Sequence, residues 1–547
     1  MRILFSLRSA AYLRYYDETI RQLLDRDHEV ILSFTRPDIE PEALDIFRSW
    51  TRRPLVSSVR FERADRYAAI ATRLRATVDY VRYLDPLYAR AEYLRDRQRQ
   101  WLSSSSRPTN FLRRRRSLPR ALVWLLIRAL LALEGAVPSS THVESSLRAL
   151  EPDVVLVSPL VAQGRSLVQV DILKSALALG IPCGACIASW DNLTNKGLLR
   201  VIPDRVMLWN VAQREEAEKL HGVPRERIVI TGAQPFDRWF GRRPERSRRA
   251  FCTELGLSPD RPIVLFLGSS RHILSFRDED AVIEEWVGAL RRSDGTARAS
   301  IVIRRHPDRM RSGDGAVVAS VPDATVWPAE RRTTVGPEVR DDLFDSLYHS
   351  DAVVGVNTSA MIEAATIGRP VLTFELPGLD EGQAGTLHFQ HMLPKHGGFL
   401  RVASSMAEHA CQLGQALDDP GSGAVARRRF VAHFIRPFGE DEPATPRLVD
   451  AIESLGRPGS QPTRPSSYAP LLRPILWPLL GREWWQRSSS QHRELSRLGG
   501  RALWSLAQRV TPFSPRLGKH LRRTAKRVKP GAPALGAASQ RRKKKHR

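Results

Sequence analysis

The chain has 547 residues, a formal net charge of +26 and a hydrophobic fraction of 42%. This length accommodates two or three domains with sizeable cores, and four cysteines in so long a chain exclude a disulfide framework. The sequence contains no run of about 18 to 20 uncharged apolar residues, so we expect no transmembrane helix. The N-terminal segment lacks the features of a secretory signal. We therefore expect a cytoplasmic protein.

The N-terminal segment reads as strand, helix and strand. The apolar run RILFSL is followed by an amphipathic pattern containing Tyr15, Ile20 and Leu23, and then by HEVILSF. This order within about 33 residues predicts a βαβ unit.

Residues 61–140 depart from that rhythm and are rich in Arg and Leu. Arg113 to Arg116 precede the segment ALVWLLIRALLAL, which has Arg128 in its middle and is too short to span a bilayer. Two interpretations stay open. One is a helical insertion packed on the first domain, and the other is an interfacial helix beside anionic lipid.

Strand and helix patterns alternate again from Asp153 onward, with the apolar runs DVVLVSP, IPCGACIAS, DRVMLWN and RIVITGA. Continuous apolar strands are typical of a parallel sheet covered on both faces. Residues 1–240 are therefore predicted to form a Rossmann-like domain that contains the insertion. Cys183 and Cys186 lie within one of these runs without further metal ligands, and we interpret them as buried strand thiols.

A second alternating series begins near Arg261. The polar residues 241–260 contain Gly and Pro and predict an interdomain linker. Apolar runs and helical patterns over residues 261–456 predict a second Rossmann-like domain. The fold class is thus α/β with two tandem doubly wound domains, which place a ligand in the crevice at the carboxyl ends of their strands.

The segment AVVGVNTSAMIEAATIGRPVLTFEL, residues 352–376, predicts a strand, a polar turn, a helix and a strand. Thr358 or Ser359 would cap the helix, with Asn357 before it and Glu363 one turn further in. Free backbone N–H groups, hydroxyls and a carboxylate would then meet at one helix start, a corner that suits a nucleotide diphosphate. An ordinary capped βαβ unit is the alternative.

This corner resembles the nucleotide-binding corner of GT-B-fold glycosyltransferases, and its layout is similar to that of UDP-N-acetylglucosamine 2-epimerases and CDP-glycerol glycerophosphotransferases. The resemblance covers about residues 1 to 455. It implies that Thr358 and Ser359 bind phosphate and that Glu363 binds the ribose. The epimerases usually have Gly-Gly after the serine and paired acids, whereas this chain has Ala360, Met361 and a single acid, a departure that disfavours the epimerase interpretation.

Two further loops carry candidate donor-site residues. By the same resemblance, the turn at Ser269, Ser270 and Arg271 faces the diphosphate, and Arg271 would stabilise the leaving group. The strand-end sequence IRRHP is similar to the His-Pro of the glycerophosphotransferases, and this match carries over to His306. An ordinary surface loop and a structural histidine are the alternatives.

The candidates for acceptor binding and proton transfer lie in two other loops. SWDNLTNKG offers Trp190 for stacking on a sugar, Asn192 and Lys196 as acceptor ligands, and Asp191 as a base; an Asx-turn would also explain this loop. His388, in EGQAGTLHFQHML, would lie beside the transferred group. No metal site and no tightly bound cofactor are expected, because neither a strand-end D-x-D nor a Walker motif occurs.

The basic tail, residues 457–547, holds 22 Lys or Arg and two acids, and so carries +20 of the net charge of +26. Trp477, Trp484 and Trp485 are interleaved with basic residues. This composition favours an anionic membrane surface over nucleic acid, and a solvated, disordered tail is an equal alternative.

Together these features predict a transferase at the inner face of the plasma membrane. It would move a sugar from a nucleotide-activated donor to a hydroxyl of a cell-surface polysaccharide, such as a capsule, or of a lipid-linked acceptor. Three alternatives remain: a glycerol- or polyol-phosphate transferase of the CDP-glycerol type, an enzyme like UDP-N-acetylglucosamine 2-epimerase, and a non-catalytic GT-B-like scaffold that binds anionic polymer.

Overall fold

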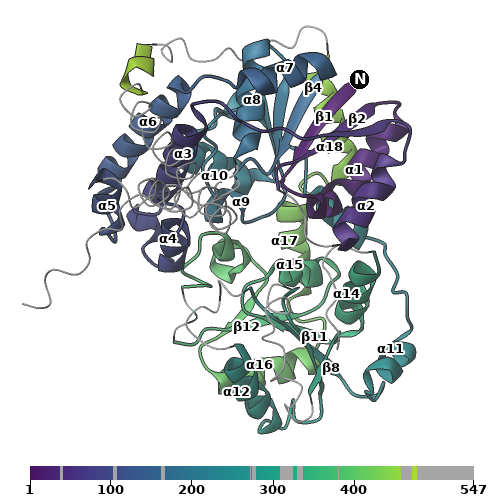
Figure 1. The fold of residues 1–547 in the computed structure, drawn as a ribbon. Coiled ribbons are helices and arrows are strands. Elements are labelled where there is room, and N and C mark those ends of the chain that lie inside the picture. The colour runs from purple at the N-terminus through teal and green to yellow at the C-terminus, as the bar shows by residue number, and fades with distance from the viewer. Residues whose placement is uncertain are drawn as a thin grey trace, which may run out of the picture. The chain divides into compact units, whose positions relative to one another are not determined.

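The computed structural model describes residues 1–36, 41–102, 107–161, 167–270, 273, 279–307, 324–328, 337–377, 379, 381–457 and 471–476. The chain divides into two units, Met1–Leu472 and Arg473–Arg547. The first unit contains two parallel sheets (Figure 1). The tail tryptophans at positions 477, 484 and 485 lie outside the described residues, so the predictions about the tail remain predictions.

The first sheet has seven strands in the order β3-β2-β1-β4-β5-β6-β7, and every neighbouring pair is parallel. The strands are β1 Arg2–Leu7, β2 Glu29–Phe34, β3 Val56–Val59, β4 Val154–Ser158, β5 Cys183–Cys186, β6 Arg205–Leu208 and β7 Ile228–Ile230. The central strands β1 and β4 are almost wholly buried because helices cover both faces. The chain reverses its direction of travel across the sheet between β1 and β4, which opens a crevice at their carboxyl ends.

Helices and short 3-10 segments connect these strands. They are η1 Ala10–Tyr12, α1 Leu13–Asp25, α2 Pro41–Thr51, α7 Thr141–Leu150, α8 Val168–Leu179, α9 Asn192–Asn195, α10 Val211–His221, η3 Arg225–Arg227 and η4 Gln234–Trp239. Cys183 and Cys186 are buried thiols on β5, which confirms their interpretation. Burial raises the pKa of the Cys186 thiol to about 12.

The second sheet has six strands in the order β10-β9-β8-β11-β12-β13, again parallel throughout. They are β8 Ile263–Leu267, β9 Ser300–Arg304, β10 Ala324–Val326, β11 Ala352–Gly355, β12 Val371–Phe374 and β13 Arg401–Ala403. The connecting segments are α12 Glu279–Arg291, α14 Pro337–His349, α15 Ser359–Thr366, η7 His388–Met392, η8 Pro394–His396, α16 Met406–Asp418, α17 Ala424–Phe430 and the π-helix η9 Val431–Ile435. The two sheets confirm the predicted pair of Rossmann-like domains.

The predicted linker needs correction, because residues 248–255 form a helix, α11 Arg248–Leu255. Phe251 and Cys252 are fully buried in one core with Ile263 and Leu265 of β8. This helix has a short amphipathic pattern, but the flanking Gly and Pro residues favoured a linker in the sequence analysis. This part of the linker belongs to the second domain.

The assignment of residues 444–455 to the second domain also needs correction. Helix α18, Ala444–Leu455, packs in the core of the first sheet, where Leu448 and Ile452 share a cluster with Ile3 and Phe5. Asp237 of η4 holds the start of α18 by accepting hydrogen bonds from the backbone N–H groups of residues 444 and 445, at 3.0 and 2.7 Å. The chain therefore returns to its first domain after completing the second.

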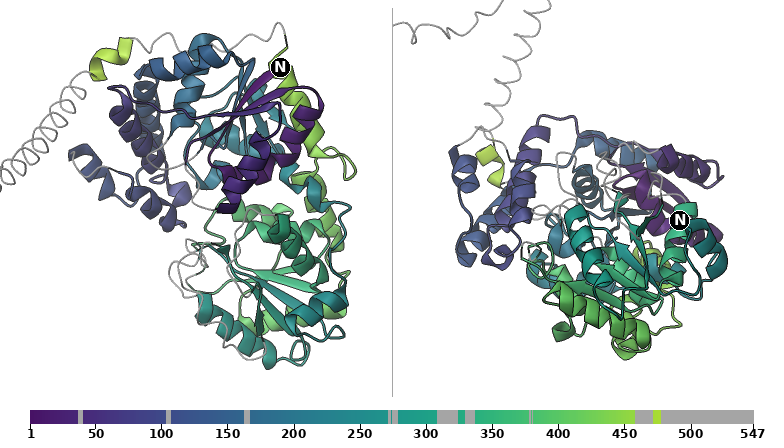
Figure 2. Two further views of the ribbon diagram at one scale, coloured as in Figure 1. Left: turned by 45° about the vertical axis from the view of Figure 1, so that its right-hand side comes forward. Right: turned by 90° about the horizontal axis from the view of Figure 1, so that it is seen from below.

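Within residues 61–140, the described parts of the chain form a helical insertion. Its elements are α3 Ala68–Arg82, η2 Pro86–Tyr88, α4 Glu92–Arg99, α5 Arg107–Arg113 and α6 Arg120–Ala136. Figure 2 shows these helices as a group beside the first sheet. Buried ion pairs join Arg75 of α3 to Glu134 of α6 at 2.9 Å and to Asp171 of α8 at 2.7 Å, so the packed insertion is confirmed.

The outer side of α6 remains exposed, with Trp124 at 60% and Leu125 at 57% of their full accessibility. Within the described residues, no single helix has the length and apolarity needed to cross a bilayer. Helices α6 and α7 meet both criteria only when taken together, and they are bent by 64° to each other.

Candidate functional site

Two adjoining cavities lie between the loops of the two sheets. We call the first the Asp191 cavity, which has a volume of about 310 Å³, and the second the Glu363 cavity, which has a volume of about 600 Å³. Both are lined by residues that follow β1 and β5 in the first domain and β9 and β11 in the second. The predicted site residues that line them are Trp190, Asp191, Asn192, Lys196, Ser270, His306, Asn357, Thr358, Ser359, Glu363 and His388. Of the other two, Ser269 lines neither cavity, and Arg271 lies outside the described residues.

Helix α15 begins at the junction of the two cavities. Thr358 is its N-cap residue, as predicted, with φ −149° and ψ 149°, but its side chain makes no capping hydrogen bond. The backbone N–H groups of Ser359 and Ala360 therefore remain available to an anion, whereas that of Met361 donates to the Thr358 carbonyl oxygen at 3.1 Å. Across the cleft, the indole N–H of Trp190 donates to the Ser359 hydroxyl oxygen at 3.0 Å, which leaves the hydroxyl proton of Ser359 able to donate.

Glu363 lies one turn into α15 and lines the larger cavity, half-buried. Burial raises the pKa of its carboxyl group, and the charges of Arg238 and Arg14 only partly oppose this effect. These arginines belong to η4 and α1 of the first domain, and Arg238 is anchored by donating to the Arg14 carbonyl oxygen at 3.0 Å. A carboxylate without a hydrogen-bond partner among the described residues is well placed to accept ribose hydroxyls.

The turn after β8 is tight because Gly268 lies against the backbone of the next strand end. A Cβ atom at this position would stand 2.8 Å from the backbone nitrogen of His306. The Ser269 hydroxyl is fully buried and accepts the Asn357 N–H at 3.4 Å, so it supports the turn and cannot reach a phosphate. Of this predicted phosphate-binding turn, Ser270 lines the Asp191 cavity.

His306 lines both cavities at the end of β9. The two arginines before it are committed to structural ion pairs. Arg304 pairs with Asp342 at 2.7 Å, and Arg305 pairs with Asp280. His306 is therefore the polar side chain of this strand end that lines both cavities.

Asp191 and Lys196 form an ion pair of 3.0 Å at the wall of the smaller cavity. Burial alone would favour the protonated acid, but Lys196, His388 and Ser189 outweigh it and hold the pKa of Asp191 below its ordinary value. Asp191 is thus a carboxylate at neutral pH, the form that a general base requires.

The two neighbours of Asp191 that were predicted to bind the acceptor are almost wholly buried. Asn192 is only 2% exposed, and its side-chain oxygen accepts the Ala188 N–H at 3.2 Å. Trp190 is 3% exposed, with its ring edge-on to His388 at a centroid distance of 4.8 Å. Trp190 therefore joins the two domains and has little ring face left for a sugar.

The protonation of His388 follows from its partner. The Asn357 side-chain amide donates to the Gly382 carbonyl at 2.6 Å, which fixes its orientation, and it also faces His388 Nε2 at 3.3 Å. Nε2 must then be the acceptor, so the imidazole proton sits on Nδ1. Nδ1 has no hydrogen-bond partner within the described residues. Burial lowers the pKa of His388 to about 4, so a neutral ring offers an N–H donor.

The sequence analysis did not predict the hydrogen bonds between the insertion and the loop that contains Asp191. Arg82 donates to the carbonyl oxygens of Lys196 and Gly197 at 3.0 and 3.1 Å, and the Tyr83 hydroxyl donates to Lys196 at 2.6 Å. Asp79, one turn earlier on α3, accepts the Leu198 N–H at 3.0 Å. The polar face at positions 79, 82 and 83 was the available signal, because these positions share one side of a helix.

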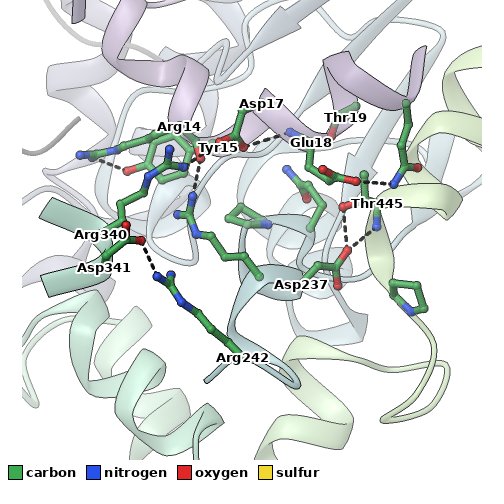
Figure 3. A pocket seen from close by; sticks show the side chains of 15 residues that line it. Arg14, Tyr15, Asp17, Glu18, Thr19, Asp237, Arg242, Arg340, Asp341 and Thr445 are labelled. Carbon is green, nitrogen blue, oxygen red and sulfur yellow. Dashed lines mark hydrogen bonds and ion pairs between the residues drawn. The ribbon is translucent and has the colours of Figure 1, made fainter. Parts of the chain in front are cut away.

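A third cavity of about 490 Å³ borders the Glu363 cavity at α1 and η4 (Figure 3). Four of its charged side chains already form ion pairs with one another. Arg340 of α14 donates to Asp17 of α1 at 2.6 Å, and Arg242 pairs with Asp341. We therefore regard it as part of the contact between the domains and place the ligand in the other two cavities.

Two parallel sheets, a helix that returns to the first of them and a cleft at the strand ends define the GT-B fold. Among the described residues, no three His, Cys, Asp or Glu side chains gather as a metal site.

No protein-family model matches the sequence, and no curated protein is similar to it. Solved structures with a similar arrangement include a putative UDP-N-acetylglucosamine 2-epimerase from Listeria monocytogenes, with 14% identity, a TM-score of 0.48, and coverage of 84% of this chain and 98% of that one. A glycosyltransferase from Rickettsia africae has 8% identity and a TM-score of 0.48 over 84% and 99% of the two chains. The wall teichoic acid polymerase TagF has 12% identity and a TM-score of 0.42 over 83% and 88%.

Proposed function

We propose that this protein is a GT-B transferase that moves a sugar from a nucleotide-activated donor to a hydroxyl of a polysaccharide or lipid-linked acceptor. One observation carries the proposal: the uncapped start of α15 and the Glu363 carboxylate face the same cleft as the paired Asp191 and Lys196. The second domain thus offers anion and ribose contacts, while the first offers a base.

The nucleotide would occupy the Glu363 cavity. Its diphosphate would meet the backbone N–H groups of residues 359 and 360 and the hydroxyls of Thr358 and Ser359, where the helix dipole favours negative charge. Glu363 would accept hydrogen bonds from the ribose hydroxyls. The transferred sugar would then extend into the Asp191 cavity, which shares Thr358 and Ser359 with the larger one.

The reaction exchanges one C–O bond for another. The acceptor oxygen attacks the anomeric carbon while Asp191 removes the hydroxyl proton, and the electron pair of the broken bond passes to the diphosphate. His306 and the start of α15 would stabilise the charge that develops on the leaving group. The neutral His388 would donate its Nδ1–H to the sugar and orient it.

Among the alternatives, glycerol- or polyol-phosphate transfer is supported by the position of His306. This residue belongs to the His-Pro pair that follows β9, and it lines both cavities. It would use the same nucleotide contacts with an attack at phosphorus. Epimerisation is disfavoured, because Ala360 and Met361 replace the glycine pair and α15 carries one acid.

A transfer assay tests the proposal. UDP-, GDP- and CDP-activated sugars and CDP-glycerol would each be incubated with polysaccharide and lipid-linked acceptors, and release of the nucleotide would be measured. Asp191→Asn should reduce the acceptor-dependent rate by at least about a hundredfold while nucleotide binding persists. Asp25→Asn, at a carboxylate that is 59% exposed, should leave the rate unchanged. Acceptor-dependent release that survives Asp191→Asn would contradict the assigned base.

The location at the inner membrane face is a further proposal, which rests on the charge of residues 457–547. Co-sedimentation of the full chain with anionic vesicles, compared with a chain ending at residue 472, tests it. Equal binding of both chains would contradict a role of the tail in membrane binding.

A further inference from the structure

Helix α4 of the insertion reaches the Asp191 cavity. Tyr93 and Arg97 lie one turn apart on the same side of this helix and line the cavity together with Asn195 and Lys196. A segment that interrupts the first domain thus supplies part of the wall at which Asp191 would act.

The cavity carries more positive than negative charge. Its charged residues are Arg8, Arg14, Arg97 and Lys196 against Asp191, and the pair of Asp191 with Lys196 consumes the single acid. Within the described part of the chain, the Arg8 side chain has neither a hydrogen-bond nor an ion-pair partner. Burial lowers the pKa of Lys196, Asp191 opposes this effect, and the charges of Arg97 and Arg8 add to it, so these cations repel one another.

Two polar groups of α4 also lack partners. Tyr93 is 7% exposed, and its buried hydroxyl has no hydrogen bond within the described residues. Arg97 donates from Nη2 to the side-chain oxygen of Asn195 at 2.7 Å, but its Nε–H is likewise unpartnered there. Buried donors of this kind are normally satisfied, so their convergence indicates a missing acceptor.

We propose that Tyr93, Arg97 and Arg8 form a subsite for an anionic group, a carboxylate or a phosphate, on the acceptor molecule. The subsite would hold this group beside the hydroxyl that Asp191 deprotonates, and it rests on the proposed transferase function. Tyr93 and Arg97 distinguish this ligand from the donor diphosphate, because they line the Asp191 cavity and not the Glu363 cavity, whereas Arg8 lines both.

The test uses matched charged and neutral sugars. Dissociation constants of glucuronate, glucose 6-phosphate and glucose would be measured by saturation-transfer NMR on the full chain, with and without the nucleoside diphosphate that it binds. Glucuronate and glucose 6-phosphate should bind about tenfold more tightly than glucose. Tyr93→Phe and Arg97→Met should each remove about that tenfold preference, since a hydrogen bond to a charged group has this size.

Controls separate this subsite from general effects. Arg99→Met alters the same helix at a side chain that is 44% exposed and should change nothing, while Arg97→Lys should keep most of the preference for charge. Tyr93→Phe retains the ring, so the fold is preserved.

Equal binding of charged and neutral sugars to the wild type would overturn the subsite, as would a preference that both variants retain. Loss of nucleotide binding in Tyr93→Phe would assign the cluster to the donor diphosphate and overturn it as well. Absence of nucleotide binding in the wild type would instead refute the proposed transferase, so the two failures are distinguishable.

Discussion

Replacement of Arg75 by Met should loosen the insertion from the first domain. The Arg75 guanidinium donates to Glu134 Oε1 at 3.0 and 2.9 Å and to the two Asp171 oxygens at 2.9 and 2.7 Å. The side chains of Arg75, Glu134 and Asp171 are 3%, 0% and 3% exposed. Removal of one partner from a buried charge cluster costs about 3 to 5 kcal/mol.

The ion pairs that remain in Arg75→Met place the expected loss of stability near the lower end of this range. Asp171 keeps Arg63 at 2.7 Å, and Glu134 keeps Lys174 at 3.5 Å. We therefore expect a loss of about 3 kcal/mol, which equals roughly a 150-fold decrease in amide protection. Hydrogen exchange of α3 and α6, followed by mass spectrometry, would measure it.

Two comparisons make this reasoning refutable. Arg120→Met changes a side chain that is 74% exposed and stands 3.8 Å from Asp85, so it should cost less than about 0.5 kcal/mol. Arg75→Met combined with Glu134→Gln should recover part of the amide protection, because the buried Glu134 carboxylate that lost its Arg75 partner is then replaced by a neutral amide. A loss below about 1 kcal/mol in Arg75→Met, or no recovery in the double variant, would refute the assigned cost.

Three further predictions concern titratable groups. Glu363→Gln should raise the thermal midpoint of the free protein at pH 7 to 8, because the raised carboxyl pKa means that ionisation costs stability as pH rises, and it should weaken nucleotide binding; an unchanged midpoint would contradict this. Lys196→Met removes the cation that lowers the pKa of Asp191, so the acid limb of kcat/KM should move to higher pH; a superimposable pH profile would refute the pairing. His409 has a pKa lowered by burial to about 4, so its contribution to stability is complete above pH 6.5 and decreases by about 3 kcal/mol as pH falls to 4. His409→Leu should flatten that part of the unfolding curve, and an unaltered slope would contradict the buried neutral ring.

The strand, turn and helix around Thr358 could be predicted from the sequence because all of their signals are local. An apolar strand, the N-cap residue Thr358 and the acid Glu363 lie within a dozen residues, and helix periodicity alone places them on one helix start. The strand and helix alternation likewise predicted both domains.

The rest depends on contacts between distant segments. The pattern of α18 shows an apolar face but not which sheet it covers, so Leu448 could not be assigned to the first domain. The grip of Arg82 on the loop at Lys196 joins residues 114 positions apart, and no local pattern encodes such a pair. Trp190 looked like a sugar platform because its burial against His388 arises only when the two domains meet.

Nucleotide binding by α15 and Glu363 can be measured through thermal stabilisation of the protein by UDP, GDP and CDP. At about 100 times its dissociation constant, a ligand adds about 2.7 kcal/mol to the free energy of unfolding. We expect that one of these nucleotides stabilises the wild type and that Glu363→Ala abolishes most of this gain. No stabilisation by any of the three, or an equal gain in Glu363→Ala, would contradict it.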